Sequence, residues 1–281
     1  MKTLIHENIK ALIQPRKADA HKGNYGHALL IAGNIGRVGA AVIAARACLR
    51  SGVGLLTVSV PQEERIILQI AIPEAMLIMR DHICDALNNY SALGMGCGIG
   101  TGDNAKKLLI NVLSQINVPL LLDADALNII SENKDLLNQL PPKTIITPHP
   151  KEFDRLFGLH ESPNDRTFTA ITKAQEYGIV IVLKGHKTLI TLGGEVFLNS
   201  TGNAGLAKGG SGDALTGIIT AFLAQGYPAF DAAKMGVYIH GLAADLTLAQ
   251  QSMESMLITD VIEHLGKAFQ RFTKCPKTLL Y

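Results

Sequence analysis

The fold class is indicated by one stretch near the N-terminus: Ala28-Leu29-Leu30-Ile31-Ala32-Gly33-Asn34, then the alanine-rich run 40–50, then Gly54-Leu55-Leu56-Thr57-Val58-Ser59-Val60-Pro61. Five consecutive apolar residues ended by glycine are typical of a buried strand, and the alanine-rich run favours a helix. The second apolar run predicts another strand, which Pro61 stops. Such strand–helix–strand units build parallel sheets that are covered on both faces.

The same alternation continues along the chain. Further strands are predicted at 75–79, 92–95, 119–122, 144–147 and 178–183, with helices at 103–115 and from 151 onward. The last quarter differs, because it predicts a hairpin near Gly193-Gly194 and long helices from Asp213 and Ala229. We therefore expect an α/β fold with a mostly parallel central sheet and helices on both faces, organised as a single domain over residues 1–281.

Composition narrows the class of protein. The chain has 281 residues, 47% of them hydrophobic, with 27 glycines and a formal net charge of +2, which suits a soluble enzyme and does not favour a nucleic-acid partner. The N-terminal residues lack the apolar core of a signal peptide, and no run is suited to a membrane span, so we expect a cytoplasmic protein. The four cysteines show no paired spacing, which predicts reduced thiols rather than structural zinc: Cys48, Cys84, Cys97 and Cys275.

Glycine-rich or polar residues follow the predicted strands. In parallel sheets these positions share one rim, where ligands bind beyond the carboxyl ends of the strands. The rim is expected to hold Gly33-Asn34 and residues 96–102, 123–128, 147–150 and 184–188.

Residues 199–219 add a glycine-rich stretch that runs into a helix. Gly209, Gly210, Ser211 and Gly212 are predicted to form an anion hole, because unpaired amides at a helix start favour a bound phosphate. The spacing matches neither the P-loop nor the dinucleotide-binding fingerprint. Asp213 has two interpretations, since aspartate is favoured in the first turn of a helix but can also act as a base on a hydroxyl group.

Other rim residues carry similar alternatives. Asp123 and Asp125 form a pair suited to magnesium or a substrate hydroxyl, although a helix cap is the favoured role for Asp125. Gly100 lies in a run that either lets a ligand approach the backbone or only makes a turn. His149 stands between two prolines, which favours ligand contact over a structural role. Lys184 follows a buried strand and suits a nucleotide phosphate, with a solvated β-turn as the alternative.

Six ordered motifs together resemble the bacterial ADP-dependent NAD(P)H-hydrate dehydratases of the ribokinase-like superfamily. The similarity extends over most of the chain, and its motifs are Lys22-Gly23-Asn24-Tyr25-Gly26, the 33–39 loop, residues 123–128, Thr147-Pro148-His149-Pro150-Lys151-Glu152, Leu183-Lys184-Gly185, and Gly202-Asn203-Ala204-Gly205 through Gly212-Asp213. The length resembles that of a stand-alone dehydratase, without the epimerase domain that many relatives carry.

The resemblance implies repair of the S epimer of hydrated NADH or NADPH, in which ADP is converted to AMP and phosphate. Magnesium would be the cofactor, ATP a possible replacement for ADP, and a homo-oligomer, specifically a tetramer, the assembly; no metal ligand is assigned. Asp213 would be the catalytic base that activates the ring hydroxyl. The nucleotide would bind at Lys184, Gly185, His186, Lys187, Thr188 and Gly212, and the hydrated dinucleotide at Ala41 (or its neighbours Gly39 and Ala40), Gly100, His149 and Asp213.

Two alternatives use the same loop and aspartate. One is a ribokinase-like kinase that phosphorylates a hydroxymethylpyrimidine or hydroxyethylthiazole type of alcohol, and the other is a non-catalytic nucleotide-binding or regulatory protein. The chain also departs from many relatives, which have threonine at the positions of Lys208 and Ser211. Lys208 is therefore expected to influence phosphate affinity.

Overall fold

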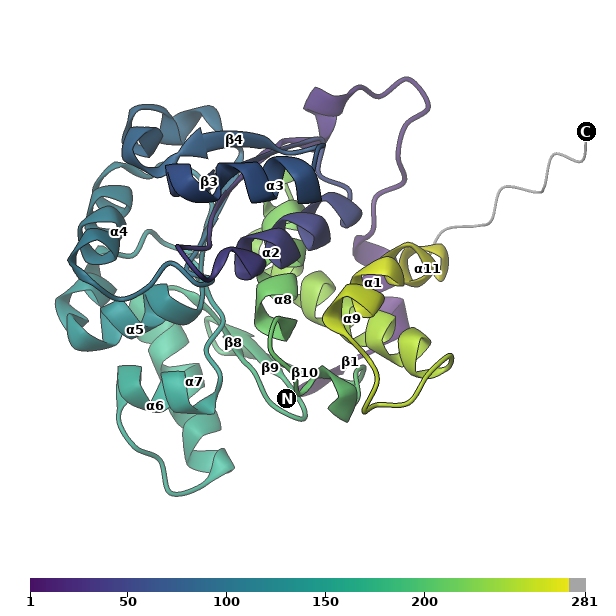
Figure 1. Cartoon of the computed structure of the whole chain (residues 1–281). Helices are drawn as coiled ribbons and strands as arrows, with labels where there is room; N and C mark the ends of the chain where they lie inside the picture. Colours follow the sequence, from purple (N-terminus) through teal and green to yellow (C-terminus); the bar gives the residue numbers. More distant parts are fainter. Residues whose placement is uncertain (273–281) are drawn as a thin grey trace, which may run out of the picture.

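A ten-stranded sheet runs through the computed structural model of the chain (Figure 1), which describes residues 1–272, apart from the side chains of 84–86. From one edge to the other the strands are β1 (Lys2–Leu4), β10 (Glu195–Asn199), β9 (Leu189–Leu192), β8 (Val180–Leu183), β7 (Ile145–Ile146), β6 (Leu120–Leu122), β5 (Ala92–Met95), β2 (His27–Ile31), β3 (Leu55–Val60) and β4 (Met76–Met79). Strand β9 is antiparallel to both of its neighbours, and the other pairs are parallel. The mostly parallel sheet is thereby confirmed.

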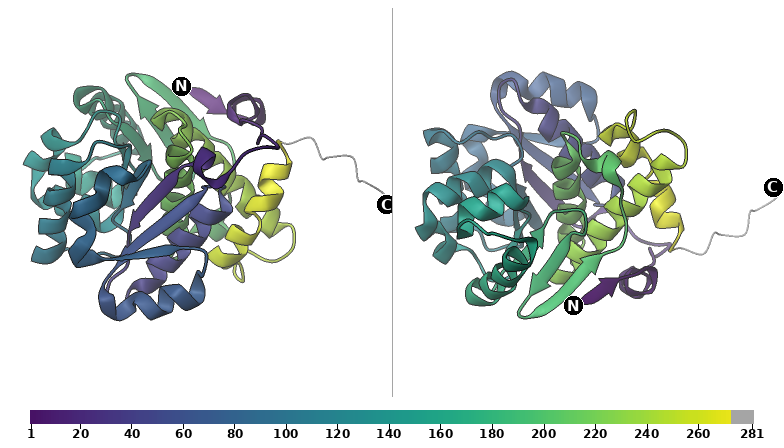
Figure 2. Two further views of the ribbon diagram at one scale, coloured as in Figure 1. Left: turned by 90° about the horizontal axis from the view of Figure 1, so that it is seen from above. Right: turned by 90° about the horizontal axis from the view of Figure 1, so that it is seen from below.

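Helices cover both faces of this sheet, as Figure 2 shows. One face carries α1 (His6–Leu12), α2 (Val38–Arg50), α3 (Arg65–Ala71), α8 (Ser211–Ala224), α9 (Ala229–Leu248), α10 (Ile258–Glu263) and α11 (Leu265–Gln270). The other carries α4 (Asp103–Gln115), α5 (Ala124–Glu132), α6 (Pro150–Phe157) and α7 (Pro163–Tyr177). Short 3-10 turns lie between them: η1 (Lys22–Tyr25), η2 (Gln62–Glu64), η3 (Arg80–Asn89), η4 (Lys134–Gln139) and η5 (Ala204–Leu206).

The two faces have separate apolar cores because strand side chains alternate in direction. In β2, Ala28 and Leu30 join the core under α2, α8 and α9, whereas Leu29 and Ile31 join the core under α4 to α7. All four side chains are fully buried. A strand with two buried faces must be apolar throughout, which is why the strand runs are uninterrupted in the sequence.

The predicted elements are recovered with small shifts at their ends. The hairpin at Gly193-Gly194 is confirmed as the β9–β10 pair. Helix α8 begins at Ser211 rather than at Asp213, and Gly102 takes the N-cap position before α4, so Asp103 is the first helical residue and not the cap. Of the cysteines, Cys48 and Cys97 are free and buried, while Cys84 and Cys275 lie outside the described side chains. Over residues 1–272, no helix combines the length and the apolarity needed to cross a membrane.

Helices α2 and α8 approach each other closely at Gly217. A Cβ atom built on Gly217 would lie 2.1 Å from the carbonyl oxygen of Ala44 in α2, a separation that no real contact allows. Alanine residues line the facing part of α2 and are buried. Small side chains thus set the distance between the two helices whose N-termini lie at the rim.

We expect Gly217→Ala to lower the free energy of unfolding by about 1–3 kcal/mol, because the helices must separate to admit the methyl group. The matched control is Gly266→Ala in α11, where a Cβ atom meets nothing within 4 Å. That substitution should be neutral or stabilising by up to about 1 kcal/mol, since alanine is the better helix former. Chemical denaturation of both variants measures the difference, and equal stabilities would contradict the close approach.

Candidate active site

The carboxyl ends of the parallel strands meet at one rim, as expected. The loops after β2, β5, β6, β7 and β8 lie there, and so does the loop after β10, because β10 runs in the same direction as β8. This loop leads into α8 and closes a cavity of about 680 Å³. The cavity is lined by residues from five segments of the chain: 123–124, 149–152, 184–188, 199–215 and 237–241.

The start of α8 forms the wall of the cavity at Ser211, Gly212 and Asp213. Gly210 is the N-cap and has a φ of 92°, and a Cβ atom there would lie 2.7 Å from Ile43 Cδ1, so the turn requires glycine. In the described part of the chain, no carbonyl or side chain accepts a hydrogen bond from the amides of Gly212 and Asp213. Unpaired amides at the positive end of a 14-residue helix can hold an anion.

Asp213 lies in the first turn of α8, and its carboxyl group is largely shielded from water. Burial raises the pKa of Asp213 to about 6, with further raising by the nearby charges of Asp123 and Asp125. The Cys97 thiol and the Lys184 ammonium act in the opposite direction and lower this pKa. A carboxylate with a pKa near 6 is ionised at neutral pH and binds a proton more readily than an ordinary aspartate, as a general base should.

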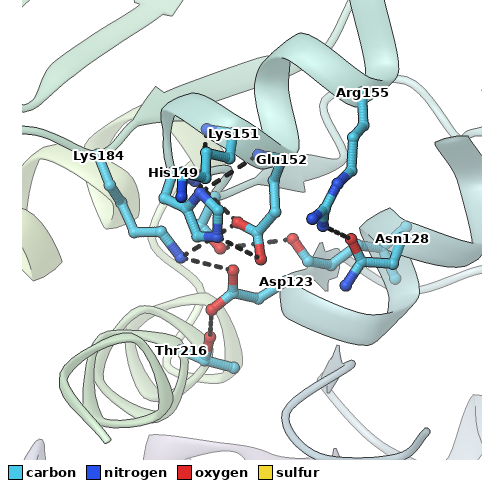
Figure 3. A network of polar contacts seen from close by, with 10 residues as sticks. Asp123, Asn128, His149, Lys151, Glu152, Arg155, Lys184 and Thr216 are labelled. Atoms are coloured by element: carbon cyan, nitrogen blue, oxygen red, sulfur yellow. Dashed lines mark hydrogen bonds and ion pairs between the residues drawn. The ribbon is translucent and has the colours of Figure 1, made fainter. Parts of the chain in front are cut away.

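Lys184 enters a buried network of charges, which Figure 3 shows. Its Nζ atom lies 2.8 Å from Asp123 Oδ1 and 3.9 Å from Glu152 Oε2. Thr216 Oγ1 donates a hydrogen bond of 3.0 Å to Asp123 Oδ2. The two carboxylates raise the pKa of Lys184 against the opposing effect of burial, which is larger than either single interaction. The alternative of a solvated β-turn is wrong for Lys184, because its ammonium is turned into the protein.

His149 is the N-cap of α6 and has a structural role. Its Nδ1 atom accepts hydrogen bonds from the amides of Lys151 and Glu152, at 3.1 and 3.2 Å, and Glu152 Oε2 accepts one from the amide of His149. The histidine side chain is nevertheless 44% exposed and lines the cavity. The ring is therefore held in place by the helix start with its outer edge free for a ligand. Contact with the hydrated dinucleotide stays a prediction.

Asp125 does not cap its helix, which corrects the role favoured for it. Its Oδ2 atom accepts a hydrogen bond of 2.8 Å from the amide of Gly100, and Arg37 Nη1 lies 3.7 Å away. Asp123 occupies the N-cap position of α5, but its side chain makes no capping hydrogen bond because it is engaged with Lys184. Asp125 thus ties the glycine loop after β5 to the start of α5.

A second group of loops meets beside the cavity. The amide of Gly33 donates a 2.7 Å hydrogen bond to the carbonyl of Cys97, which joins the loop after β2 to the loop after β5. These loops lie where the strand order reverses, between β2 and β5, the usual place for a ligand crevice. The Cys97 thiol in this region lowers the pKa of Asp213, and Asp213 lines the cavity, so the two regions adjoin at Asp213.

Some of the predicted site residues line the cavity and others lie outside it. Gly185, His186 and Thr188 line the cavity, whereas Lys187 is exposed outside its lining. Ala41 is fully buried in α2, while its neighbour Gly39 is exposed at the start of that helix. Lys208 does not point to the anion hole, because its Nζ atom bonds the carbonyl oxygen of Glu254.

The pattern of the sequence did not identify four residues of the site. Glu152 and Thr216 complete the network around Asp123, and Asp245 accepts hydrogen bonds from the Gly202 amide and the Asn203 side chain, at 2.9 and 3.0 Å, which holds the loop after β10. His240 lines the cavity. Its pKa is lowered to about 4, mainly by burial and to a smaller extent by the positive charge of Lys184. Thr216, His240 and Asp245 lie in helices among apolar neighbours, which give no local signal of a site. Glu152 lies in the polar first turn of α6, and its place in the Thr147 to Glu152 motif was the available signal.

The side chains do not form a metal site of their own. Over residues 1–83 and 87–272, no group of three or more metal-ligating side chains comes together. Each acid already has partners: Asp123 has Lys184 and Thr216, Asp125 has Gly100, and Glu152 has the His149 amide. The carboxylates nevertheless outnumber the nearby cations, so an anionic ligand is favoured when it brings a divalent cation with it, as nucleotides do with magnesium.

Comparisons with known proteins agree on one family. A family model described as NAD(P)H-hydrate dehydratase matches residues 28–267. The chain is 40% identical to the ADP-dependent (S)-NAD(P)H-hydrate dehydratase of Neisseria meningitidis, over 84% of this chain and 81% of that protein. A crystal structure of the Bacillus subtilis ADP/ATP-dependent dehydratase, co-crystallised with ATP/Mg2+, superimposes with a TM-score of 0.87 at 33% identity and covers 97% of this chain and 99% of that one.

Two further comparisons concern the fold and the length. A ribokinase-like superfamily protein from Enterococcus faecalis superimposes with a TM-score of 0.88 at 30% identity, over 96% of each chain, so the fold is ribokinase-like. The bifunctional NAD(P)H-hydrate repair enzyme of Vibrio cholerae is 40% identical over 91% of this chain. The chain spans about half the length of that relative, 52%.

Proposed function

The chain belongs to the NAD(P)H-hydrate dehydratase family, and on this premise we propose that it dehydrates the S epimer of hydrated NADH and NADPH at the expense of ADP. The products are NADH or NADPH, AMP and phosphate. The kinase alternative is weaker, because relatives at 34–40% identity that match most of this chain carry the dehydratase name.

The proposed reaction begins with Asp213 as general base. Its carboxylate takes the proton of the ring hydroxyl, and the hydroxyl oxygen attacks the terminal phosphorus of ADP while the bond to the AMP oxygen breaks. The unpaired amides of Gly212 and Asp213 donate hydrogen bonds to the oxygens of the transferred phosphoryl group, and Lys184 offsets the negative charge of these oxygens. The phosphate then leaves C6 of the ring as the nitrogen lone pair forms a C=N bond. Loss of a proton from the adjacent ring carbon, C5, to water moves the double bond into the ring and gives neutral NADH or NADPH. A magnesium ion bound to the nucleotide would neutralise further phosphate charge.

One observation carries this proposal: a half-buried carboxylate with a raised pKa adjoins unpaired amides at a helix start. A carboxylate beside an anion hole repels the anion unless it acts on a neighbouring neutral group, and the substrate hydroxyl is such a group. The loops that meet at Cys97, with the exposed edge of His149, would hold the hydrated dinucleotide, and the part of the cavity at Lys184 to Thr188 would hold ADP. Asp213 would then lie between acceptor and donor.

The reaction is tested by mixing hydrated NADH with protein, ADP and magnesium and following the absorbance band of the reduced nicotinamide. Recovery of the band together with release of AMP and phosphate is expected. ATP in place of ADP tests the nucleotide preference. If the band does not recover and a pyrimidine or thiazole alcohol is phosphorylated instead, the kinase alternative replaces the dehydratase.

The pH dependence should report on Asp213. Because the base must be ionised, kcat/KM is expected to rise with pH, with an apparent pKa of about 6, and to level off above neutrality. The profile is measured from initial rates in buffers of constant ionic strength. A range of about four pH units, from pH 4.5 to 8.5, brackets the transition. A flat profile across pH 6 would exclude Asp213 as the base.

We further propose a homo-oligomer, with a tetramer as the expected form, in the cytoplasm. Exposed isoleucines on α3, at 66, 67 and 70, adjoin the exposed Met76 of edge strand β4, and such an apolar group supports contact between subunits. The free thiols of Cys48 and Cys97 suit a reducing compartment. Light scattering of the purified protein gives the number of subunits.

A further inference from the structure

Asp123 is the most buried acid at the site, and the proposed reaction gives it no role. Asp123 is 1% exposed, and both of its carboxylate oxygens have partners. Oδ1 accepts from Lys184, which follows β8, and Oδ2 accepts from Thr216 in α8. A buried charge persists only when it is paired and hydrogen-bonded, and these two contacts also hold the carboxylate in one orientation.

The paired ammonium lies at the start of α8. A Cβ atom built on Gly212 would be 3.4 Å from Asp123 Oδ2 and also 3.4 Å from Lys184 Nζ. Lysine is a flexible side chain with a strongly hydrated charge, so without an anchor its head group would turn to water. The contact with Asp123 instead holds the cation beside Gly212.

We propose that Asp123 is a positioning residue for the dehydratase reaction, and this inference rests on the function proposed above: it holds the Lys184 ammonium where the transferred phosphoryl group meets the Gly212 amide. An ammonium group has three N–H donors. Asp123 accepts one of these N–H groups. Glu152 lies farther from the ammonium, at 3.9 Å, so a donor remains for a phosphate oxygen. The cation is thus placed before the nucleotide arrives.

The charge of Asp123 also acts on the base. The groups that face Asp213 are Asp123 at the end of β6, Asp125 in α5, Lys184 after β8 and the Cys97 thiol after β5. Glu152 in α6 and His240 in α9 face Lys184 in turn. Removal of the Asp123 charge takes away a repulsive neighbour and leaves Lys184 less compensated. Both changes favour the ionised form of Asp213 and lower its pKa.

The decisive variant is Asp123→Asn, which keeps the shape of the side chain. We expect kcat/KM for ADP to fall by roughly 10- to 100-fold and the apparent pKa of the pH profile to move down by about one unit. The matched control is Asp154→Asn, which breaks another partly buried acid–base cluster, with Arg166 and His160, outside the cavity. That control should lose stability without a shift of the pH profile.

An Asp123→Asn enzyme with the wild-type pH profile and ADP dependence would overturn the inference. The same holds if the apparent pKa of the pH profile moves as far in Asp154→Asn as in Asp123→Asn. If Asp123→Asn does not fold, Thr216→Val removes the hydrogen bond that orients Asp123 and keeps the Asp123 charge. Its KM for ADP should rise several-fold, and an unchanged KM would count against a positioning role.

Direct binding separates this inference from the proposed reaction. Calorimetric titration of the wild type and Asp123→Asn with magnesium-ADP needs no hydrated substrate. Roughly tenfold weaker binding in the variant is expected even if the wild type proves inactive on hydrated NADH. Equal affinities would refute the placement of Lys184 while leaving the dehydratase assignment intact.

Discussion

Asp213→Asn should reduce kcat by about 10²–10⁴-fold while ADP binding is preserved, because an amide cannot take the hydroxyl proton. The same variant should be more stable than the wild type above pH 6. The folded protein raises the pKa of Asp213 to about 6, so its ionised form opposes folding at higher pH. Substitution by a neutral amide removes this cost of roughly 2–3 kcal/mol. The difference should shrink as the pH falls below 6 and be lost near the ordinary pKa of an aspartate, about 4, below which the wild-type carboxyl is protonated in both the folded and the unfolded state.

Two measurements on Asp213→Asn check this result. Single-turnover recovery of NADH gives the loss of rate, and thermal unfolding at pH 4 and pH 8 gives the change of stability. A residue that serves only to stabilise the first turn of the helix would behave in the opposite way, because its substitution would lower stability and leave turnover near normal. The signs of the two effects therefore separate a catalytic from a structural Asp213.

Lys184→Met is expected to destabilise the protein by about 3–5 kcal/mol, because it leaves Asp123 charged, buried and without its cation. Turnover should also fall, since the cation at the start of α8 is lost. Adding Asp123→Asn to this variant should restore most of the stability but not the turnover, because the stranded charge disappears while the ammonium remains absent.

Denaturation of the two single variants and the double variant gives the coupling energy of the pair. Lys187→Met is the matched control, because Lys187 is exposed and has no place in the cavity lining. It should change stability by less than about 0.5 kcal/mol. Additive losses for Lys184→Met and Asp123→Asn would show that the pair makes no net contribution.

The alternation of strands and helices predicted the α/β class and the rim, and the six motifs predicted the family. Apolar runs such as 28–32 and 179–183 are local signals, and parallel strands place their carboxyl ends together whatever the side chains of the loops are. Asp213 stood out for the same reason, since a glycine-rich helix start with an adjacent acid is visible in a few consecutive residues. The single domain over 1–281, and the ligand contacts of Gly100, His149 and Ala41, stay predictions.

These local patterns could not predict which side chains from distant segments form hydrogen bonds or ion pairs with each other. Asp125 was expected to cap its own helix, yet its carboxylate accepts from Gly100, a residue 25 positions earlier. Asp123 and Lys184 are 61 positions apart and neither signals the other. Lys208 drew attention as an unusual cation in the anion loop, but a backbone carbonyl of the 250–256 segment holds it away.

The sequence by itself thus determined which residues lie at the rim, because strand ends and helix starts are encoded by neighbouring residues. The tertiary structure decided what state those residues are in. Asp213 acquires its raised pKa, and Lys184 its buried partner, only when the loops after β5, β6 and β8 close around the start of α8. Desolvation and Coulomb interactions depend on distances through space, which the order of residues along the chain does not record.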